Sequence, residues 1–278
     1  MTGEPVESVY SSVVSLRSLR IVSFLSVLNQ LELWGADIGN AYLEAKTKEK
    51  LFIIAGDKFG DRKGHILIIR RALYGLKSSR NRWHERFADC LRHEDFTPVK
   101  CDTDVWMRKS KDKKSYEYIA VYVDDLMIAM KDPTDFCKML KDKYNFKLKG
   151  DGPISYHIGL NYSRDKDGTL VQQPEKYIEK MVDSYEQMFG TKPKKMKTPL
   201  EKGDHPEIDD SELLDEEGIK KYLTMVGQLQ WLISLGRFDI FSAVVSFSRY
   251  RVAPRIGHLQ RLQQIYGYSC HTSTNEEY

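Results

Sequence analysis

The spacing of apolar residues changes along the chain. Before residue 175, short runs of β-branched and aromatic residues bounded by turn residues predict mainly strands. In the remainder, apolar residues spaced three and four apart predict helices. This change indicates an α+β body followed by a helical subdomain. The predicted helices span residues 13–31, 81–93, 134–144, 174–188, 216–234, 237–250 and 254–268.

Three pairs of apolar runs predict β-hairpins, because each pair is separated by a polar turn or loop segment. A further strand, residues 32–37, precedes a predicted turn at residues 37–40. Residues 192–210 are first basic and then polar, and they contain proline, so we expect a linker there. The predicted hairpins pair residues 51–54 with 65–69, 116–123 with 126–130, and 154–161 with 169–173.

Two adjacent carboxylates, Asp124 and Asp125, form the predicted turn between residues 116–123 and 126–130. An Asp-Asp pair suits a two-residue turn poorly, because such turns favour Asn-Gly or Asp-Gly. The two negative charges also repel each other, and a bound divalent cation would remove that cost. The pair therefore indicates a metal site, with an exposed polar turn as the alternative interpretation.

A third carboxylate, Asp37, ends the predicted strand at residues 32–37. A carboxylate at a strand end can lie beside the tip of a neighbouring hairpin. Three carboxylates at such a point can hold two metal ions about 3.5–4 Å apart, which is the arrangement that polymerases use for phosphoryl transfer. Taken alone, Asp37 could also cap the N-terminus of a helix.

The composition narrows the class of protein. Of the 278 residues, 41% are hydrophobic and 30% are charged, which allows a globular core and argues against a membrane protein. Residues 1–9 lack the apolar stretch of a signal peptide. The net charge of +3 permits nucleic-acid binding but does not argue for it. The wide spacing of the cysteines favours reduced thiols over a zinc site or disulfides; they are Cys90, Cys101, Cys137 and Cys270.

Several segments resemble, in order, the motifs of copia-type LTR retrotransposon reverse transcriptases. Residues 37–43, Asp-Ile-Gly-Asn-Ala-Tyr-Leu, are similar to the first palm motif. Residues 72–79, Ala-Leu-Tyr-Gly-Leu-Lys-Ser-Ser, with Trp83 beyond them, are similar to the second. Residues 122–125, Tyr-Val-Asp-Asp, resemble the catalytic box. The remaining segments are residues 152–159, which resemble the approach to the primer grip, and residues 226–227, 237–240 and 248–249, which resemble the helical region after the palm.

The resemblance implies a right-hand polymerase fold of the α+β class. Its palm would be an antiparallel sheet backed by helices, joined to partial fingers and to a C-terminal helical thumb or connection subdomain. The implied boundaries are residues 1–32 and 46–72 for the partial fingers, 33–45 and 73–173 for the palm, 174–270 for the thumb or connection, and 271–278 for a tail.

The resemblance also implies an RNA-directed DNA polymerase that uses two Mg²⁺ ions, or Mn²⁺ in their place. Asp37 and Asp124 would bind the metal ions directly, and Asp125 would support them. The expected partners are an RNA template, a DNA or RNA primer, dNTPs, and the ribonuclease H and integrase regions of a parent polyprotein, with no membrane. The expected location is a cytoplasmic virus-like particle or the nucleus, and the chain is not expected to be secreted.

Further residues receive roles from the resemblance alone. Tyr42 occupies the place of the steric gate against a 2′-hydroxyl, with an ordinary core tyrosine as the alternative. Lys147 and Lys149 are candidates to protonate the pyrophosphate leaving group, with solvated lysines as the alternative. The residues expected at the incoming nucleotide are Tyr42, Tyr74, Gly75 and Lys77, and those expected at the primer are Tyr122, His157, Ile158 and Gly159.

The chain departs from the family pattern at several points. Ser78, Ser79 and Arg80 stand where the family has Gln and then Ser-Pro, and Phe238 replaces a proline. We also expect the basic fingers segment, which precedes this region in the family, to be missing. The chain would then be a poor polymerase or a non-catalytic relic that at most binds nucleic acid. Apolar residues left uncovered would include Val14, Leu19 and Phe24.

Overall fold

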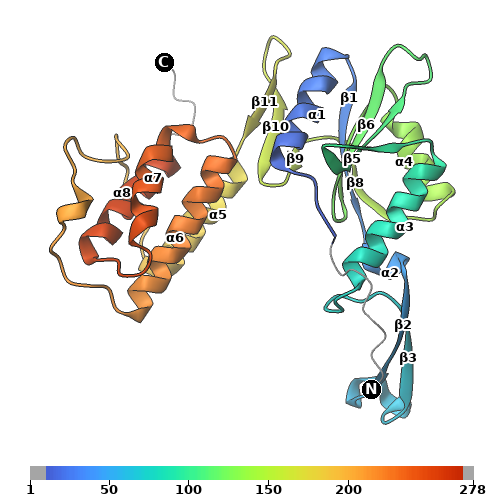
Figure 1. The fold of residues 1–278 in the computed structure, drawn as a ribbon, viewed down its shortest axis with the longest axis horizontal. Helices are drawn as coiled ribbons and strands as arrows, with labels where there is room; N and C mark the ends of the chain where they lie inside the picture. The colour runs from blue at the N-terminus through green and yellow to red at the C-terminus, as the bar shows by residue number, and fades with distance from the viewer. Residues whose placement is uncertain (1–10, 272–278) are drawn as a thin grey trace. The chain divides into compact units, whose positions relative to one another are not determined.

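The chain folds into two compact units, Met1–Ile154 and Ser155–Tyr278. The computed structural model describes residues 11–271. Figure 1 shows the helices and strands of both units. No helix within the described part of the chain is long and apolar enough to cross a membrane.

In residues 11–154 of the first unit, six strands form one antiparallel sheet in the order β4-β5-β6-β7-β1-β8. Its strands are β1 (Glu32–Ile38), β4 (Thr97–Val99), β5 (Asp102–Lys109), β6 (Tyr116–Tyr122), β7 (Asp125–Met130) and β8 (Leu148–Pro153). The helices of this unit are α1 (Leu16–Leu28), α2 (Ala41–Glu44), α3 (Ser79–His93) and α4 (Pro133–Asp142).

Helices cover both faces of this sheet. The side chains of α3 and α4 share one core with Ile128 of β7. On the opposite face, Ser23 of α1 places its Oγ 3.8 Å from Sδ of Met127. Met127 and Ile128 follow each other in one strand and therefore point to opposite faces. The first unit is thus a sheet between α1 on one side and α3 with α4 on the other, which explains why β7 is almost entirely apolar.

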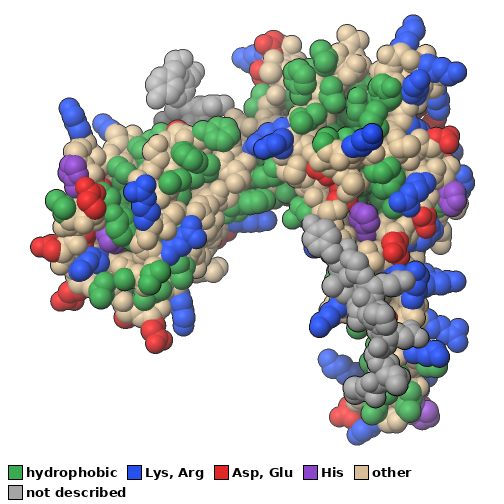
Figure 2. Space-filling view, viewed as in Figure 1, with side chains coloured by type: hydrophobic (Ala, Val, Ile, Leu, Met, Phe, Trp, Pro, Cys, Tyr) green, Lys and Arg blue, Asp and Glu red, His purple; other side chains and the backbone are tan. Residues whose placement is uncertain are grey.

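A separate two-stranded hairpin belongs to the first unit. Strands β2 (Lys46–Ile54) and β3 (Ile66–Arg71) pair antiparallel, with a 3₁₀ turn at Asp57–Arg62 between them. The predicted hairpin is confirmed, and its first strand is longer than expected. Figure 2 shows lysine and arginine side chains gathered along it. Four large apolar side chains on one of its faces are exposed: Phe52, Ile54, Ile66 and Ile68.

The second unit combines a small sheet with helices. In residues 155–271, β9 (Tyr156–His157), β10 (Leu160–Arg164) and β11 (Leu170–Gln173) form a sheet in the order β11-β10-β9. The helices are α5 (Glu175–Phe189), α6 (Glu216–Ser234), α7 (Phe241–Phe247) and α8 (Ile256–His271), with 3₁₀ turns at Pro206–Ile208, Phe238–Ile240 and Ser248–Tyr250. These helices bury one shared apolar core that includes Tyr222, Phe247 and Tyr266.

Local signals in the sequence account for where several helices begin and end. Ser15 accepts a hydrogen bond from the Ser18 amide at the start of α1, and Asp132 accepts one from the Asp135 amide at the start of α4. Gly190, with φ +72°, ends α5 in the left-handed conformation that glycine adopts without strain. Each predicted helix has a counterpart within a few residues.

The prediction of a strand at residues 154–161 is wrong. Ile158 and Gly159 have φ angles of +46° and +88°, so the chain turns there instead of extending. This turn separates β9 from β10, and the hairpin is formed by β10 and β11. Strands β4, β5 and β8 were not predicted from the sequence.

Two further expectations need correction. The predicted linker, residues 192–210, is irregular but packs onto α8, where Arg261 Nε donates to Asp204 Oδ1 at 2.7 Å. Of the three apolar residues expected to be uncovered, Val14 and Leu19 are each only 2% exposed, because they pack into the sheet unit. Phe24, on the outer side of α1, is 65% exposed as expected.

Candidate active site

The first pair of carboxylates lies on neighbouring strands. Asp37 of β1 is directly opposite Asp125 of β7 in the antiparallel register. Residues opposite each other in such a pair have Cβ atoms about 4.5–5.5 Å apart and point to the same face. Asp37 and Asp125 are therefore side by side, as we expected from the strand end and the hairpin tip.

The hairpin turn is one residue earlier than predicted. Tyr122 pairs with Asp125, so the two-residue turn is Val123-Asp124 and not Asp124-Asp125. Val123 has φ +62°, the conformation that the first position of a type II′ turn requires and that a β-branched residue rarely adopts. Asp125 becomes the first residue of β7, and Asp124 lies at the tip.

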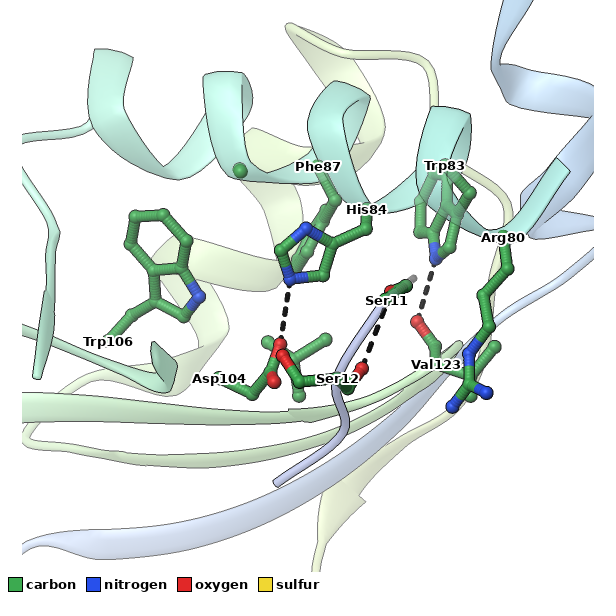
Figure 3. Close-up of a pocket in the computed structure, with 11 residues that line it drawn as sticks. Ser11, Ser12, Arg80, Trp83, His84, Phe87, Asp104, Trp106 and Val123 are labelled. Atoms are coloured by element: carbon green, nitrogen blue, oxygen red, sulfur yellow. Dashed lines mark hydrogen bonds and ion pairs between the residues drawn. The ribbon is translucent and has the colours of Figure 1, made fainter. Parts of the chain in front are cut away.

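Two hydrogen bonds hold this turn. The indole Nε1 of Trp83, in α3, donates to the Val123 carbonyl at 2.7 Å. The amide of Ile38 donates to the Asp124 carbonyl at 2.9 Å. Figure 3 shows the Trp83 bond beside the small pocket lined by α3, β5 and β6. The carbonyls of both turn residues are thus fixed, one by a helix and one by the strand that carries Asp37.

The three carboxylates influence one another. Burial, followed by the charges of Asp124 and Asp37, raises the pKa of Asp125 to about 6. Burial and the Asp37 charge also raise the pKa of Asp124. Negative charge is therefore crowded at this edge of the sheet, which is the electrostatic condition under which a cation binds favourably.

The carboxylates suit a cation that takes other ligands as well. Within residues 11–271, no three His, Cys, Asp or Glu side chains are arranged to hold a metal ion by themselves. Mg²⁺ usually binds through one or two carboxylates together with waters and substrate phosphates, and not in an all-protein cage. Asp37, Asp124 and Asp125 fit that pattern of binding.

Two tyrosines stand beside the carboxylates. The rings of Tyr42 and Tyr74 are 4.5 Å apart between centroids, at an interplanar angle of 52°. Tyr42 is half-buried against the core, whereas Tyr74 is 64% exposed. Burial, followed by the charges of Asp124, Tyr42 and Asp37, raises the pKa of Tyr74, which places this ring within electrostatic reach of the carboxylates.

The loop after Tyr74 is open. Gly75 has φ +94°, and a Cβ atom added there would meet nothing within 4 Å. Its backbone conformation favours glycine, and the space beside it is free for a ligand. Lys77, also on this loop, is exposed. The loop closes on α3, because Ser79 Oγ donates to the Leu73 carbonyl at 2.6 Å.

A lysine continues the row of charged residues across the sheet. Lys149 of β8 is opposite Asp37 on the side away from Asp125. A Cβ atom added to Gly39 would lie 3.0 Å from Cε of Lys149, so the lysine stem runs close to the turn after β1. Asp125, Asp37 and Lys149 therefore form one cross-strand row. Lys147 is exposed and accepts a hydrogen bond from the Gly39 amide through its carbonyl.

The residues expected at the primer fall into both units. Tyr122, at the end of β6, is opposite Asp125 and half-buried. His157, Ile158 and Gly159 belong to the second unit. His157 is 4% exposed, burial lowers its pKa to about 4, and its Nε2 has no hydrogen-bond partner among the described residues. His157 is therefore neutral at physiological pH.

Comparisons with known proteins agree with these features. The family model described as reverse transcriptase (RNA-dependent DNA polymerase) matches residues 1–202, which is most of the chain. The chain belongs to this reverse transcriptase family. The family membership that the motifs predicted is thereby confirmed.

Named relatives are retrotransposon proteins of plants and yeast. The retrovirus-related Pol polyprotein from transposon TNT 1-94 of Nicotiana tabacum is 25% identical over 276 residues, covering 96% of this chain and 20% of that protein. The corresponding polyprotein from transposon RE1 of Arabidopsis thaliana is 28% identical, covering 93% of this chain and 17% of that protein. The putative transposon Ty5-1 protein of Saccharomyces cerevisiae is 25% identical, covering 84% of this chain and 74% of that protein.

This reverse transcriptase-family chain thus spans about one fifth of the two plant polyproteins. In the sequence, Trp83 is recognisable only as a tryptophan beyond the second motif. Its bond to Val123 joins residues 40 positions apart, and no local pattern signals such a contact. The presence of a tryptophan shortly after the second motif was the only hint.

Proposed function

We propose that this chain is an RNA-directed DNA polymerase, which joins a dNTP to the 3′-hydroxyl of a primer on an RNA template. The observation that carries the proposal is the meeting of Asp37 with Asp125 across β1 and β7, with Asp124 at the adjoining turn. Polymerases use two metal ions about 3.5–4 Å apart for phosphoryl transfer, and neighbouring carboxylates are suitable ligands for them.

Asp37 and Asp124 would hold two Mg²⁺ ions, or Mn²⁺, with Asp125 supporting them. When bound, the ions stabilise the charge on the attacking and leaving oxygens. The raised pKa values of Asp124 and Asp125 support this assignment, since a cation would relieve the crowding that raises them. Lys149 or Lys147 would donate a proton to the pyrophosphate leaving group, and the pairing of Lys149 with Asp37 across the strands favours Lys149.

The nucleotide would bind against Tyr42 and Tyr74. The contact between their rings supports a rigid wall at the carboxylates, with Tyr42 excluding a 2′-hydroxyl by its bulk. Gly75 leaves room for a base or backbone to approach, and the exposed Lys77 is available to a phosphate. In this proposal the first unit carries the partial fingers and palm.

The remaining assignments concern the primer and the parent protein. Tyr122, which is opposite Asp125, would contact the primer end, and His157, Ile158 and Gly159 would contribute a primer grip. The helices after residue 174 would act as the thumb or connection subdomain. The parent polyprotein would supply ribonuclease H and integrase, as in the relatives named Pol polyproteins, and the reaction would take place in a virus-like particle or the nucleus.

Primer extension tests the proposal. The purified chain, given oligo(dT) on poly(rA), millimolar dTTP and Mg²⁺, should extend the primer, and a chelator should abolish extension. Failure to extend with either Mg²⁺ or Mn²⁺, while the chain still binds the primer–template, would support the alternative of a non-catalytic relic. Extension that persists in excess chelator would contradict the metal-dependent mechanism.

A further inference from the structure

Trp83 connects helix α3 to the turn that carries Asp124. Its side chain is 1% exposed, and its Nε1 donates to the Val123 carbonyl at 2.7 Å (Figure 3). A buried indole N–H usually finds a partner, but this partner is the backbone of a catalytic turn and not of a neighbouring helix. The hydrogen bond therefore comes from a helix, whereas the carboxylates lie on strands β1 and β7 and on the turn before β7.

The turn needs such a restraint. Val123 is held at φ +62°, a conformation that is strained for a β-branched residue and persists only when its surroundings impose it. Two bonds impose it here, one from Trp83 to Val123 and one from the Ile38 amide to Asp124. Without the first, the peptide between Val123 and Asp124 would be free to rotate toward a relaxed turn, and the Asp124 side chain would move with it.

Trp83 itself is fixed by packing. Its ring stacks on Phe87 at 5.4 Å between centroids and meets the edge of Phe146 at 5.6 Å. The indole N–H therefore points at the Val123 carbonyl without needing to be ordered by it. A donor held in place by its own neighbours loses little entropy when it makes its bond.

The helix that carries Trp83 also anchors the loop that contains Tyr74 and Gly75. Ser79, at the first position of α3, donates from Oγ to the Leu73 carbonyl at 2.6 Å. One rigid helix thus holds the loop at one point and the Val123-Asp124 turn at another. The distance between these two parts of the site is set by α3.

We infer that Trp83 is a positioning residue of the active site, whose indole N–H locks the strained Val123-Asp124 turn and so fixes the direction of the Asp124 carboxylate. Its effect on turnover rests on the proposed function, whereas its effect on the turn does not. Loss of the N–H should lower kcat while leaving the KM for dNTP nearly unchanged, because Trp83 touches the turn and not the nucleotide loop.

Trp83→Phe tests the inference, with Trp106→Phe as its matched control. Both tryptophans are buried, at 1% and 3% exposure, but Trp106 lies in β5 against Arg92 and makes no bond to the turn. Hydrogen exchange is measured in the full chain at the Ile38 amide, which donates to the other turn carbonyl. Trp83→Phe should speed this exchange by about five- to twentyfold, the effect of losing roughly one hydrogen bond, and Trp106→Phe should not.

Primer extension by the same two variants provides the second readout. Trp83→Phe should lower kcat by about tenfold, with the KM for dTTP within about twofold of the unsubstituted chain, and Trp106→Phe should change neither. Unchanged exchange at Ile38 in Trp83→Phe would overturn the inference. Faster exchange with unchanged kcat would overturn its catalytic part. Faster exchange in a chain that never extends a primer would support the turn lock and refute the proposed function.

A second substitution covers the case in which Trp83→Phe does not fold. Glycine adopts φ +62° without strain, so Val123→Gly should make the turn independent of its lock. The double variant Val123→Gly with Trp83→Phe should then fold and match Val123→Gly in Ile38 exchange. If the double variant fails to fold while Val123→Gly alone folds, Trp83 acts through core packing, and the inference is wrong.

Discussion

Replacing Asp125 by asparagine should stabilise the first unit, and it should do so only at pH values at which the Asp125 carboxylate would be charged. The substitution keeps the size of the side chain and removes one of three crowded charges. Burial and the charges of Asp124 and Asp37 raise the pKa of Asp125 to about 6, whereas an aspartate in an unfolded chain titrates near about 4. Below about pH 4 the group is protonated in both states and carries no penalty.

The loss of folding stability caused by Asp125 grows as the pH rises from about 4 to about 6, the pKa values of this group in the unfolded and folded chain. The unfolded chain loses its proton first, so the folded state becomes relatively less stable until Asp125 also ionises, and the loss is complete above about pH 7. A shift of about two units corresponds to roughly 3 kcal/mol, which solvent screening at this half-buried position reduces to about 1–2 kcal/mol. Asp125→Asn should therefore add about 1–2 kcal/mol to the free energy of unfolding near pH 7.5 and much less near pH 4.

Urea unfolding followed by tryptophan fluorescence measures this difference. The four tryptophans of the chain include Trp231 in the second unit, so a Trp231→Phe background leaves only signals from the first. Comparison of Asp125→Asn with its parent at each pH cancels the titration of the groups that do not interact with Asp125. A gain in stability of the same size at both pH values, or a loss near neutral pH, would refute the reasoning.

Asp102→Asn provides a control of opposite sign. Burial acts to raise the pKa of Asp102, but hydrogen bonds from the Ser18 hydroxyl, at 2.6 Å, and from backbone amides outweigh it and lower the pKa. A lowered pKa stabilises the fold above about pH 4 and loses this effect only as the pH falls further. Asp102→Asn should therefore be destabilising by a nearly constant amount across the range in which the effect of Asp125→Asn changes.

Two further substitutions test the nucleotide site and the second unit. Tyr42→Val should raise ribonucleotide incorporation relative to dNTP incorporation by roughly tenfold or more, measured by competitive extension. Tyr42→Phe keeps the ring and should not change this ratio. Equal discrimination against ribonucleotides in both variants would mean that Tyr42 is an ordinary core tyrosine. Gly159→Ala should destabilise the second unit by about 1–3 kcal/mol in urea unfolding, because φ is +88° there and the new Cβ would lie 3.2 Å from Leu235. Gly227→Ala is its control, since Gly227 lies in helix α6 with open space around it, and should be neutral or slightly stabilising.

Local patterns in the sequence predicted the elements that bring the carboxylates together. Asp37 ends the predicted strand, and Asp124 and Asp125 form the predicted turn of a hairpin, so the carboxylates come together if these two elements are neighbours in one sheet. The helices were equally accessible, because their apolar faces and caps are local. Asp215, for example, accepts from the Gly218 amide at the start of α6, where the prediction placed this helix.

Features that depend on distant residues could not be predicted. The one-residue shift of the turn follows from the pairing of Asp125 with Asp37 and from a strained Val123 held by Trp83. Strand β5 was missed because Asp102 and Asp104 interrupt its apolar pattern. Asp102 accepts a hydrogen bond from the Ser15 amide at the start of α1, and Asp104 Oδ1 lies 2.8 Å from Nε2 of His84. Both contacts exist only in the folded unit.

The burial of the N-terminal apolar residues was mispredicted for a similar reason. The prediction that Val14 would be exposed assumed that only the basic fingers segment of the family could cover it. Instead the Val14 amide donates to the Val121 carbonyl at 3.2 Å, which draws the residue before α1 against the edge of β6. Leu19 then faces the sheet, while Phe24, farther along α1, points away from it.

In the proposed function, Asp37 and Asp124 hold the metal ions of a polymerase. Single-turnover extension of oligo(dT) on poly(rA) with Mg²⁺ measures it most directly, in the unsubstituted chain, Asp37→Asn, Asp124→Asn and the control Asp89→Asn. Asp89 is an exposed carboxylate of α3, paired with Arg92 at 2.9 Å and remote from the turn. The rate should fall by about a thousandfold or more in each of the first two variants and stay unchanged in the control, because losing a metal ligand costs several kcal/mol of transition-state stabilisation. Rates for Asp37→Asn and Asp124→Asn within about tenfold of the unsubstituted chain would contradict the claim.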